Sequence, residues 1–102
     1  MRFEETDNML TCIFSGDQNS ETSTIAEPEL IDRVNAFMQD RDRGEIAFDL
    51  AEVAYVSSAF LRLCLWCCKR VGNRNFSIRG VSPELLKVFQ IAGFVEMMNV
   101  GA

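Results

Sequence analysis

The chain has 102 residues, of which 48% are hydrophobic and 25% charged, with two prolines, and this composition is typical of one globular domain spanning residues 1–102. Its net charge of −5 would repel nucleic-acid phosphates and anionic lipid headgroups, so neither is an expected partner. Without a membrane-length apolar run, and with a start that lacks signal-peptide features, the chain is expected to be cytoplasmic and not inserted in a membrane.

The first predicted element is a strand over residues 9–15. Its more apolar positions alternate with others, and the pattern ends at Gly16; these positions are Leu10, Cys12 and Phe14. The polar segment 17–24 is predicted to be a loop. A helix is predicted from Pro28, a residue suited to the first helical position, to about Arg43. Its inner stripe is expected to comprise Leu30, Val34, Phe37 and Met38.

The same alternation predicts two more strands, over residues 46–50 and 76–79, and the three strands indicate a sheet covered chiefly on one side. A second helix is predicted from Ser57 or Ser58 to about Val71. A third helix is predicted to begin at Ser82-Pro83-Glu84 and to bury Leu85, Val88, Phe89 and Ala92. A short helix is expected over residues 94–98. Strands that alternate with helices favour an α/β layer fold.

The second helix combines an apolar face with a positively charged outer stripe. On a helical wheel, the inner face holds Phe60, Leu61, Cys64, Leu65, Cys67, Cys68 and Val71. The outer stripe holds Ser58, Arg62, Trp66, Lys69 and Arg70. The serine at the helix start either caps the first-turn N–H groups or is presented to the active site of a partner. A phosphate there would add about −1.5 to −2 charges and could block docking without unfolding the domain.

Other patterns leave alternatives open. Trp66 either lies across a neighbouring loop or contributes to a protein interface. Three clustered cysteines suit a metal or redox site, or else act as small hydrophobic side chains in the core; they are Cys64, Cys67 and Cys68. Asp17 and Asp49 could be paired carboxylates, or solvated and capping groups. Because the chain has no histidine, no histidine-based triad can be built, and we expect no metal, cofactor or catalysis. A thiol-dependent activity is the enzymatic alternative.

Two stretches share their order and spacing with a known family. Residues 48–62 read FDLAEVAYVSSAFLR, and residues 81–84 read VSPE, followed by Phe89 and Gly93. This order resembles the STAS family of anti-sigma factor antagonists and related domains of sulphate transporters. There, a strand ending in Asp-Leu leads to Asp-Ser-Ser-Gly-Leu or Asp-Ser-Ala-Gly-Leu, and a later Ser-Pro helix ends in glycine. The resemblance spans about residues 9–98 and implies an α/β fold: a small mixed β-sheet of four to five strands with helices mainly on one face.

The resemblance also implies a regulatory binding domain that is not an enzyme and whose partner is a serine-kinase anti-sigma factor. In the family, binding releases a sigma factor, and phosphorylation by the kinase reverses the binding. The phosphorylated serine corresponds to Ser58, with Ser57 as the second choice. Partner contacts are expected at Asp17, Ser57, Ala59, Phe60, Arg62 and Trp66. Because Ser57 replaces an aspartate and Phe60 a glycine, the alternative is a STAS scaffold or transporter-associated subunit that binds proteins without phosphorylation.

Overall fold

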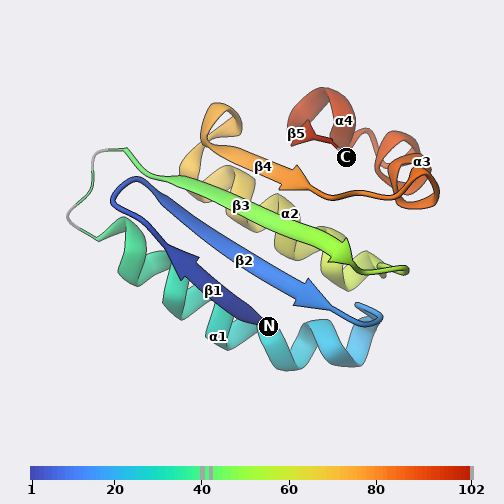
Figure 1. Ribbon diagram of the computed structural model, residues 1–102, viewed down its shortest axis with the longest axis horizontal. Helices are drawn as coiled ribbons and strands as arrows, with labels where there is room; N and C mark the ends of the chain where they lie inside the picture. The colour runs from blue at the N-terminus through green and yellow to red at the C-terminus, as the bar shows by residue number, and fades with distance from the viewer. Residues whose placement is uncertain (40, 42, 102) are drawn as a thin grey trace.

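The computed structural model describes residues 1–39, 41 and 43–101, and its helices and strands alternate along the chain (Figure 1). Five strands form one sheet in the order β1-β2-β3-β4-β5, so each strand lies beside its neighbour in the sequence. The strands are β1 (Arg2–Glu5), β2 (Met9–Ser15), β3 (Glu45–Glu52), β4 (Phe76–Arg79) and β5 (Asn99–Val100). The helices are α1 (Ser20–Met38), α2 (Ser58–Val71), the 3-10 turn η1 (Asn73–Asn75), α3 (Pro83–Ile91) and α4 (Phe94–Met97).

The sheet is mixed, as the α/β prediction expected. β1 runs antiparallel to β2, whereas β2, β3, β4 and β5 are parallel. Helices join the parallel strands, because the chain must cross back along the sheet before each new strand begins. The alternation had predicted β2, β3 and β4 but neither edge strand. β1 is mostly charged and β5 has only two residues, so neither carries a clear apolar period.

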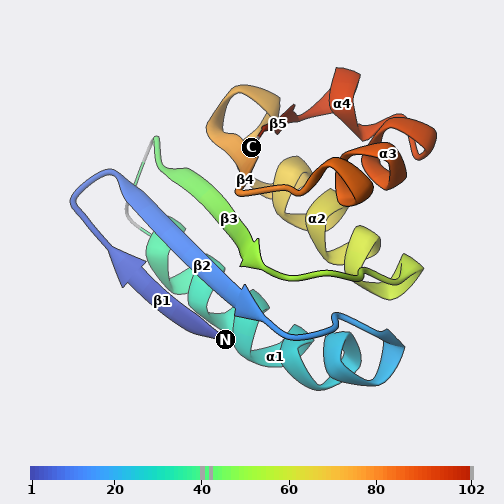
Figure 2. The same cartoon turned by 45° about the vertical axis from the view of Figure 1, so that its right-hand side comes forward.

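One face of the sheet carries the core, and α1 and α2 cover it (Figures 1 and 2). Phenylalanine rings from three strands and α2 pack there. Phe48 lies 4.9 Å from Phe14 and 5.0 Å from Phe76, between ring centroids, and Phe60 lies 5.0 Å from Phe14. The opposite face carries smaller and more polar side chains in register, among them Thr11, Ala47, Ser77 and Asn99. The prediction of a sheet covered chiefly on one side is therefore confirmed.

Helix α1 begins earlier than predicted. Asn19 caps it, because the Asn19 side chain accepts a hydrogen bond of 2.8 Å from the N–H of Thr22. Most of the predicted loop over residues 17–24 is therefore helical. Pro28 lies inside the helix rather than at its first position, so the carbonyl of Thr24 loses its usual helical donor. The loop prediction was wrong because a serine- and threonine-rich segment can be helical when a capping residue precedes it.

Helix α1 also ends earlier than the predicted end near Arg43. Its last helical residue is Met38, and Gln39 is extended with φ −61° and ψ 133°. Residues 40 and 42 lie outside the described part of the chain. The predicted inner stripe is confirmed, since all four of its members pack in or against the core: Leu30, Val34, Phe37 and Met38.

Helices α2 and α3 begin close to the predicted residues. Gly72 ends α2 with a φ of 93°, a conformation that favours glycine. Ser82 caps α3 by accepting from the N–H of Leu85 at 3.2 Å, and Pro83 is the first helical residue. Ala92, which was expected to be buried, is exposed just beyond the end of α3. Among the described residues, no helix has the length and apolar character needed to cross a bilayer.

Candidate functional site

Two chain segments lie side by side where α1 and α2 begin. The N–H of Gly16 donates to the carbonyl of Glu52 at 3.1 Å, and the N–H of Gln18 donates to that of Tyr55 at 2.9 Å. The N–H of Ser57 in turn donates to the carbonyl of Gln18 at 2.9 Å. These bonds continue the parallel pairing of β2 and β3 beyond the strands. They fix the start of α2 at the carboxyl edge of the sheet, where α/β folds commonly bind ligands.

The two neighbouring serines at the start of α2 have different roles. Ser57 is the cap: it is 7% exposed, and its Oγ accepts a hydrogen bond of 3.3 Å from the N–H of Phe60. Ser58 is the first helical residue and is exposed. Its hydroxyl forms no hydrogen bond with the residues that the structure describes. The capping oxygen and the accessible hydroxyl thus belong to different residues, and Ser58 faces solvent as expected.

The first turn of α2 is a favourable place for negative charge. The N–H groups of Ser58 and Ala59 occupy the first two helical positions, where no helical carbonyl can accept from them. The first turn contains no acidic residue. The exposed Arg62 lies one turn along the same face as Ser58. A phosphate on Ser58 would therefore meet the positive end of the helix dipole and a nearby guanidinium group.

Three of the predicted contact residues reach the surface. Asp17 is exposed, and the next residue, Gln18, is hydrogen-bonded to Tyr55 and Ser57 just before α2. Arg62 is exposed on the second turn of α2. Trp66 is half-buried and packs against the core. The structure therefore places Asp17 and Arg62 on the surface beside Ser58, with Trp66 further along the helix.

The other three predicted contact residues are buried. Ser57, Ala59 and Phe60 are 7%, 9% and 0% exposed. The Phe60 ring belongs to the aromatic cluster of the core, with its centroid 6.0 Å from that of Phe48. The family resemblance had assigned these residues to the contact surface, but their burial leaves little side chain for a partner to touch. They hold Ser58 in position from inside the domain.

Tyr55 is a surface residue that the sequence patterns did not single out. It is 51% exposed, although it lies between Val53 and Val56 in an apolar link. Both valines are buried, at 5% and 6% exposure, and the link turns the tyrosine outward. Tyrosine is enriched among residues that dominate interface binding energies. One signal was present in the sequence: Tyr55 is the only tyrosine of the chain, and it lies two residues before Ser57.

The cysteines fit the core interpretation better than the thiol-chemistry one. All four are free and buried: Cys12, Cys64, Cys67 and Cys68. Burial raises the pKa of Cys12 to about 12 and raises the pKa of the other three thiols above the usual value of 9.0. Protonated thiols are poor nucleophiles and poor metal ligands. In the described part of the chain, no three metal-ligating side chains come together.

We expect the native thiols to react slowly with a chromogenic disulfide reagent at pH 8. With the protein unfolded in urea, the reagent should release four equivalents of chromophore at once, because all four cysteines then ionise near their usual pKa. The measurement is absorbance against time for native and denatured protein. A full equivalent released by the native protein within the mixing time would revive the thiol-dependent alternative.

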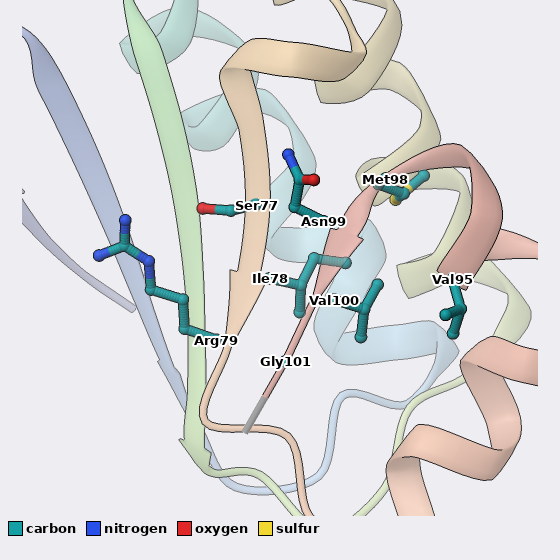
Figure 3. A pocket seen from close by; sticks show the side chains of 8 residues that line it. All are labelled: Ser77, Ile78, Arg79, Val95, Met98, Asn99, Val100 and Gly101. Carbon is teal, nitrogen blue, oxygen red and sulfur yellow. The ribbon is translucent and has the colours of Figure 1, made fainter.

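A hollow also lies at the edge of the sheet, between β4, β5 and α4 (Figure 3). Its walls include the apolar side chains of Ile78, Val95 and Val100. Arg79 is its only ionisable lining residue among those described, and Figure 3 shows the Arg79 side chain extending away from these apolar groups. The other lining residues are apolar or uncharged polar residues or glycine.

Known proteins resemble this chain in sequence or fold. No family model matches it. A Bordetella bronchiseptica protein named as an anti-sigma factor antagonist, BtrV, is 28% identical over 102 residues, covering 98% of this chain and 84% of BtrV. A STAS domain protein from Planctomyces limnophilus has a TM-score of 0.73 at 20% identity, covering 99% of this chain and 88% of its own.

Two structures of the anti-sigma factor antagonist SpoIIAA also match. The unphosphorylated form has a TM-score of 0.70 at 13% identity, covering 99% of this chain and 86% of its own. The phosphorylated Bacillus form has a TM-score of 0.68 at 15% identity, covering 99% and 90%. With the mixed five-stranded sheet, these likenesses show that the chain has the fold of STAS domain proteins and of the anti-sigma factor antagonist SpoIIAA.

Proposed function

We propose that this domain is an anti-sigma factor antagonist that binds a serine-kinase anti-sigma factor through the surface around Ser58. The observation that carries the proposal is that Ser57 caps α2, which leaves the Ser58 hydroxyl exposed and free of hydrogen bonds to the described residues. Asp17, Tyr55 and Arg62 supply exposed polar and aromatic groups around it. The names of BtrV and SpoIIAA, both anti-sigma factor antagonists, support a partner of this class.

Phosphorylation of Ser58 is the proposed off-switch. The kinase transfers the γ-phosphoryl group of ATP to Oγ: an O–P bond forms, ADP leaves, and a base of the kinase takes the hydroxyl proton. The free N–H groups of the first turn stabilise the product, so the fold is retained. A partner that docks on the phosphorylated surface must then desolvate the phosphate dianion, which weakens binding. The match to a phosphorylated form of SpoIIAA supports a modification of this kind.

A second function, a STAS scaffold that binds proteins without phosphorylation, draws support from Ser57. Serine and aspartate both cap helices well, so Ser57 preserves the start of α2. However, Ser57 lacks the negative charge of the aspartate that the family has beside the acceptor hydroxyl, and this loss favours a domain that is not phosphorylated. The Phe60 departure carries less weight, because that side chain points into the core and leaves the surface at Ser58 open.

A pair of alanine variants tests the proposal. Ser58→Ala is expected to abolish phosphate incorporation from ATP by the cognate kinase and to change the free energy of unfolding by less than about 0.5 kcal/mol. Ser57→Ala is expected to lower that free energy by about 1 kcal/mol, because the cap is lost, and to leave Ser58 a substrate. Intact-protein mass spectrometry and urea denaturation measure the two effects. An unmodified wild-type protein, or a phosphorylated Ser58→Ala variant, would favour the scaffold or another acceptor.

A further inference from the structure

We infer that the outer face of α2 is a docking surface for an acidic segment of a protein partner. We call this face the basic stripe; its residues are Leu61, Arg62, Leu65, Trp66 and Lys69. The inference rests on the proposed function for the identity of the partner, and it adds the chemistry by which that partner is recognised.

The basic stripe presents only positive charge. The 14 residues of α2 contain no aspartate or glutamate, and Arg62 and Lys69 are both exposed. Positions three and four apart share a helix face, so these cations lie on the same side as Leu65 and Trp66. Leu65 and Trp66 are half-buried, as is Leu61. The stripe therefore offers accessible apolar groups between two cations.

Among the residues that the structure describes, Arg62 and Lys69 form no ion pair, although the chain has 15 acidic residues and only ten basic ones. Among the described residues, both ion pairs belong to Glu5, whose partners are Arg33 at 3.3 Å and Arg41 at 3.9 Å. Neither Arg62 nor Lys69 has an acidic partner in that part of the chain. Their charges remain available to another molecule.

The neighbouring helix, α1, carries acidic residues. α1 lies beside α2 on the same face of the sheet (Figures 1 and 2). It exposes four acidic side chains: Glu21, Glu27, Glu29 and Asp32. A hydrogen bond of 3.0 Å joins α2 to α1, donated by Arg70 Nε to Asn35 Oδ1. The cations of the basic stripe and these four carboxylates thus lie on two adjacent helices.

This arrangement favours a protein partner over other polyanions. Duplex DNA or an anionic membrane would extend past α2 and meet the acidic α1 together with the net charge of −5. A protein can confine its carboxylates to a strip that faces Arg62 and Lys69 alone. An apolar centre containing tryptophan, flanked by arginine, is also the composition typical of strongly binding interface positions. The matching occupant is an acidic helix or loop with apolar side chains.

The test uses the folded domain and a synthetic helical peptide that repeats Glu and Leu with helical spacing. A matched peptide carries Gln in place of Glu. Each peptide is titrated into the ¹⁵N-labelled domain, and binding is followed by the amide chemical shifts. The Glu peptide should shift the signals of α2, and the Gln peptide should bind at least tenfold more weakly. The affinity for the Glu peptide should fall several-fold between about 0.05 and 0.5 M salt, because added salt screens the charges.

Charge-reversal variants locate the surface. Arg62→Glu with Lys69→Glu should weaken binding of the Glu peptide at least tenfold. The matched control is Arg2→Glu with Arg79→Glu, which makes the same charge change at exposed positions of the uncovered sheet face and should alter binding less than twofold. Equal losses in both variants, shifts centred away from α2, or equal binding of the Gln peptide would overturn the inference.

Two further outcomes have a defined meaning. Binding of phosphatidylserine vesicles or duplex DNA through Arg62 and Lys69, as tightly as the Glu peptide, would replace the protein occupant and overturn the inference. Phosphorylation of Ser58 is measured separately by mass. Peptide binding without phosphorylation supports the basic stripe and rejects the switch, whereas phosphorylation without peptide binding does the reverse.

Discussion

Ser58→Asp is expected to weaken binding of the cognate kinase by at least about tenfold, equivalent to about 1.4 kcal/mol. The aspartate places a permanent negative charge on the exposed first residue of α2, and docking must then desolvate it. The fold should be unaffected, because an acid in the first helical turn interacts favourably with the helix dipole. Binding is measured by calorimetry and stability by urea denaturation.

Two controls separate charge from size and from position. Ser58→Asn changes the shape without adding charge and should retain most of the affinity. Asn8→Asp adds one charge at an exposed position just before the first residue of β2, at the end of the sheet away from Ser58. It should change the affinity by less than about twofold. Unchanged affinity in Ser58→Asp would reject the phosphorylation switch and leave the scaffold function as the better account.

Phe60→Ala is expected to lower the free energy of unfolding by about 3–5 kcal/mol, a large share of the about 5–15 kcal/mol typical of a domain. Phe60 is 0% exposed, and its ring contacts both Phe14 and Phe48 in the core. Replacement by glycine, which the family has at this position, should cost still more because glycine weakens a helix. The measurement is urea denaturation followed by circular dichroism.

An exposed apolar residue provides the control for this effect. Ile91 is 89% exposed, so Ile91→Ala should change stability by less than about 0.5 kcal/mol. Phe60→Leu keeps most of the buried volume and should fall between the two. A loss below about 1 kcal/mol in Phe60→Ala would show that the ring is not an essential part of the core and would reopen its assignment to the partner surface.

The central strands and helices were predictable from sequence because their apolar periods are long and clear. β2, β3 and β4 alternate over consecutive residues, and α2 has a broad apolar face ended by Gly72. β1 could not be found in this way, because its charged residues form a strand only through their ladder with β2. The start of α1 was missed because Asn19 caps a segment whose composition is typical of a loop.

The candidate site was predictable in place but not in detail. The serine pair could be located at a helix start, yet two adjacent serines are equally good caps in sequence. The choice depends on the hydrogen bonds that Gln18 donates to the carbonyl of Tyr55 and accepts from the N–H of Ser57, which fix where the helix begins. Phe60 shows the limit of residue-by-residue transfer from a family: the helical wheel placed it inside, the family motif placed it at the contact surface, and the structure agrees with the wheel.

The strand order β1-β2-β3-β4-β5 has a consequence for how the domain is made. Each strand pairs with the strand before it in the sequence, so no later strand must be inserted between two earlier ones. The sheet can therefore grow by addition at one edge during synthesis. Domains form from the N-terminal side during synthesis, and pairing between chain neighbours keeps the entropy of loop closure low. Each new strand pairs with the edge that the previous strand left open, so the topology allows assembly by stepwise docking of strands and helices.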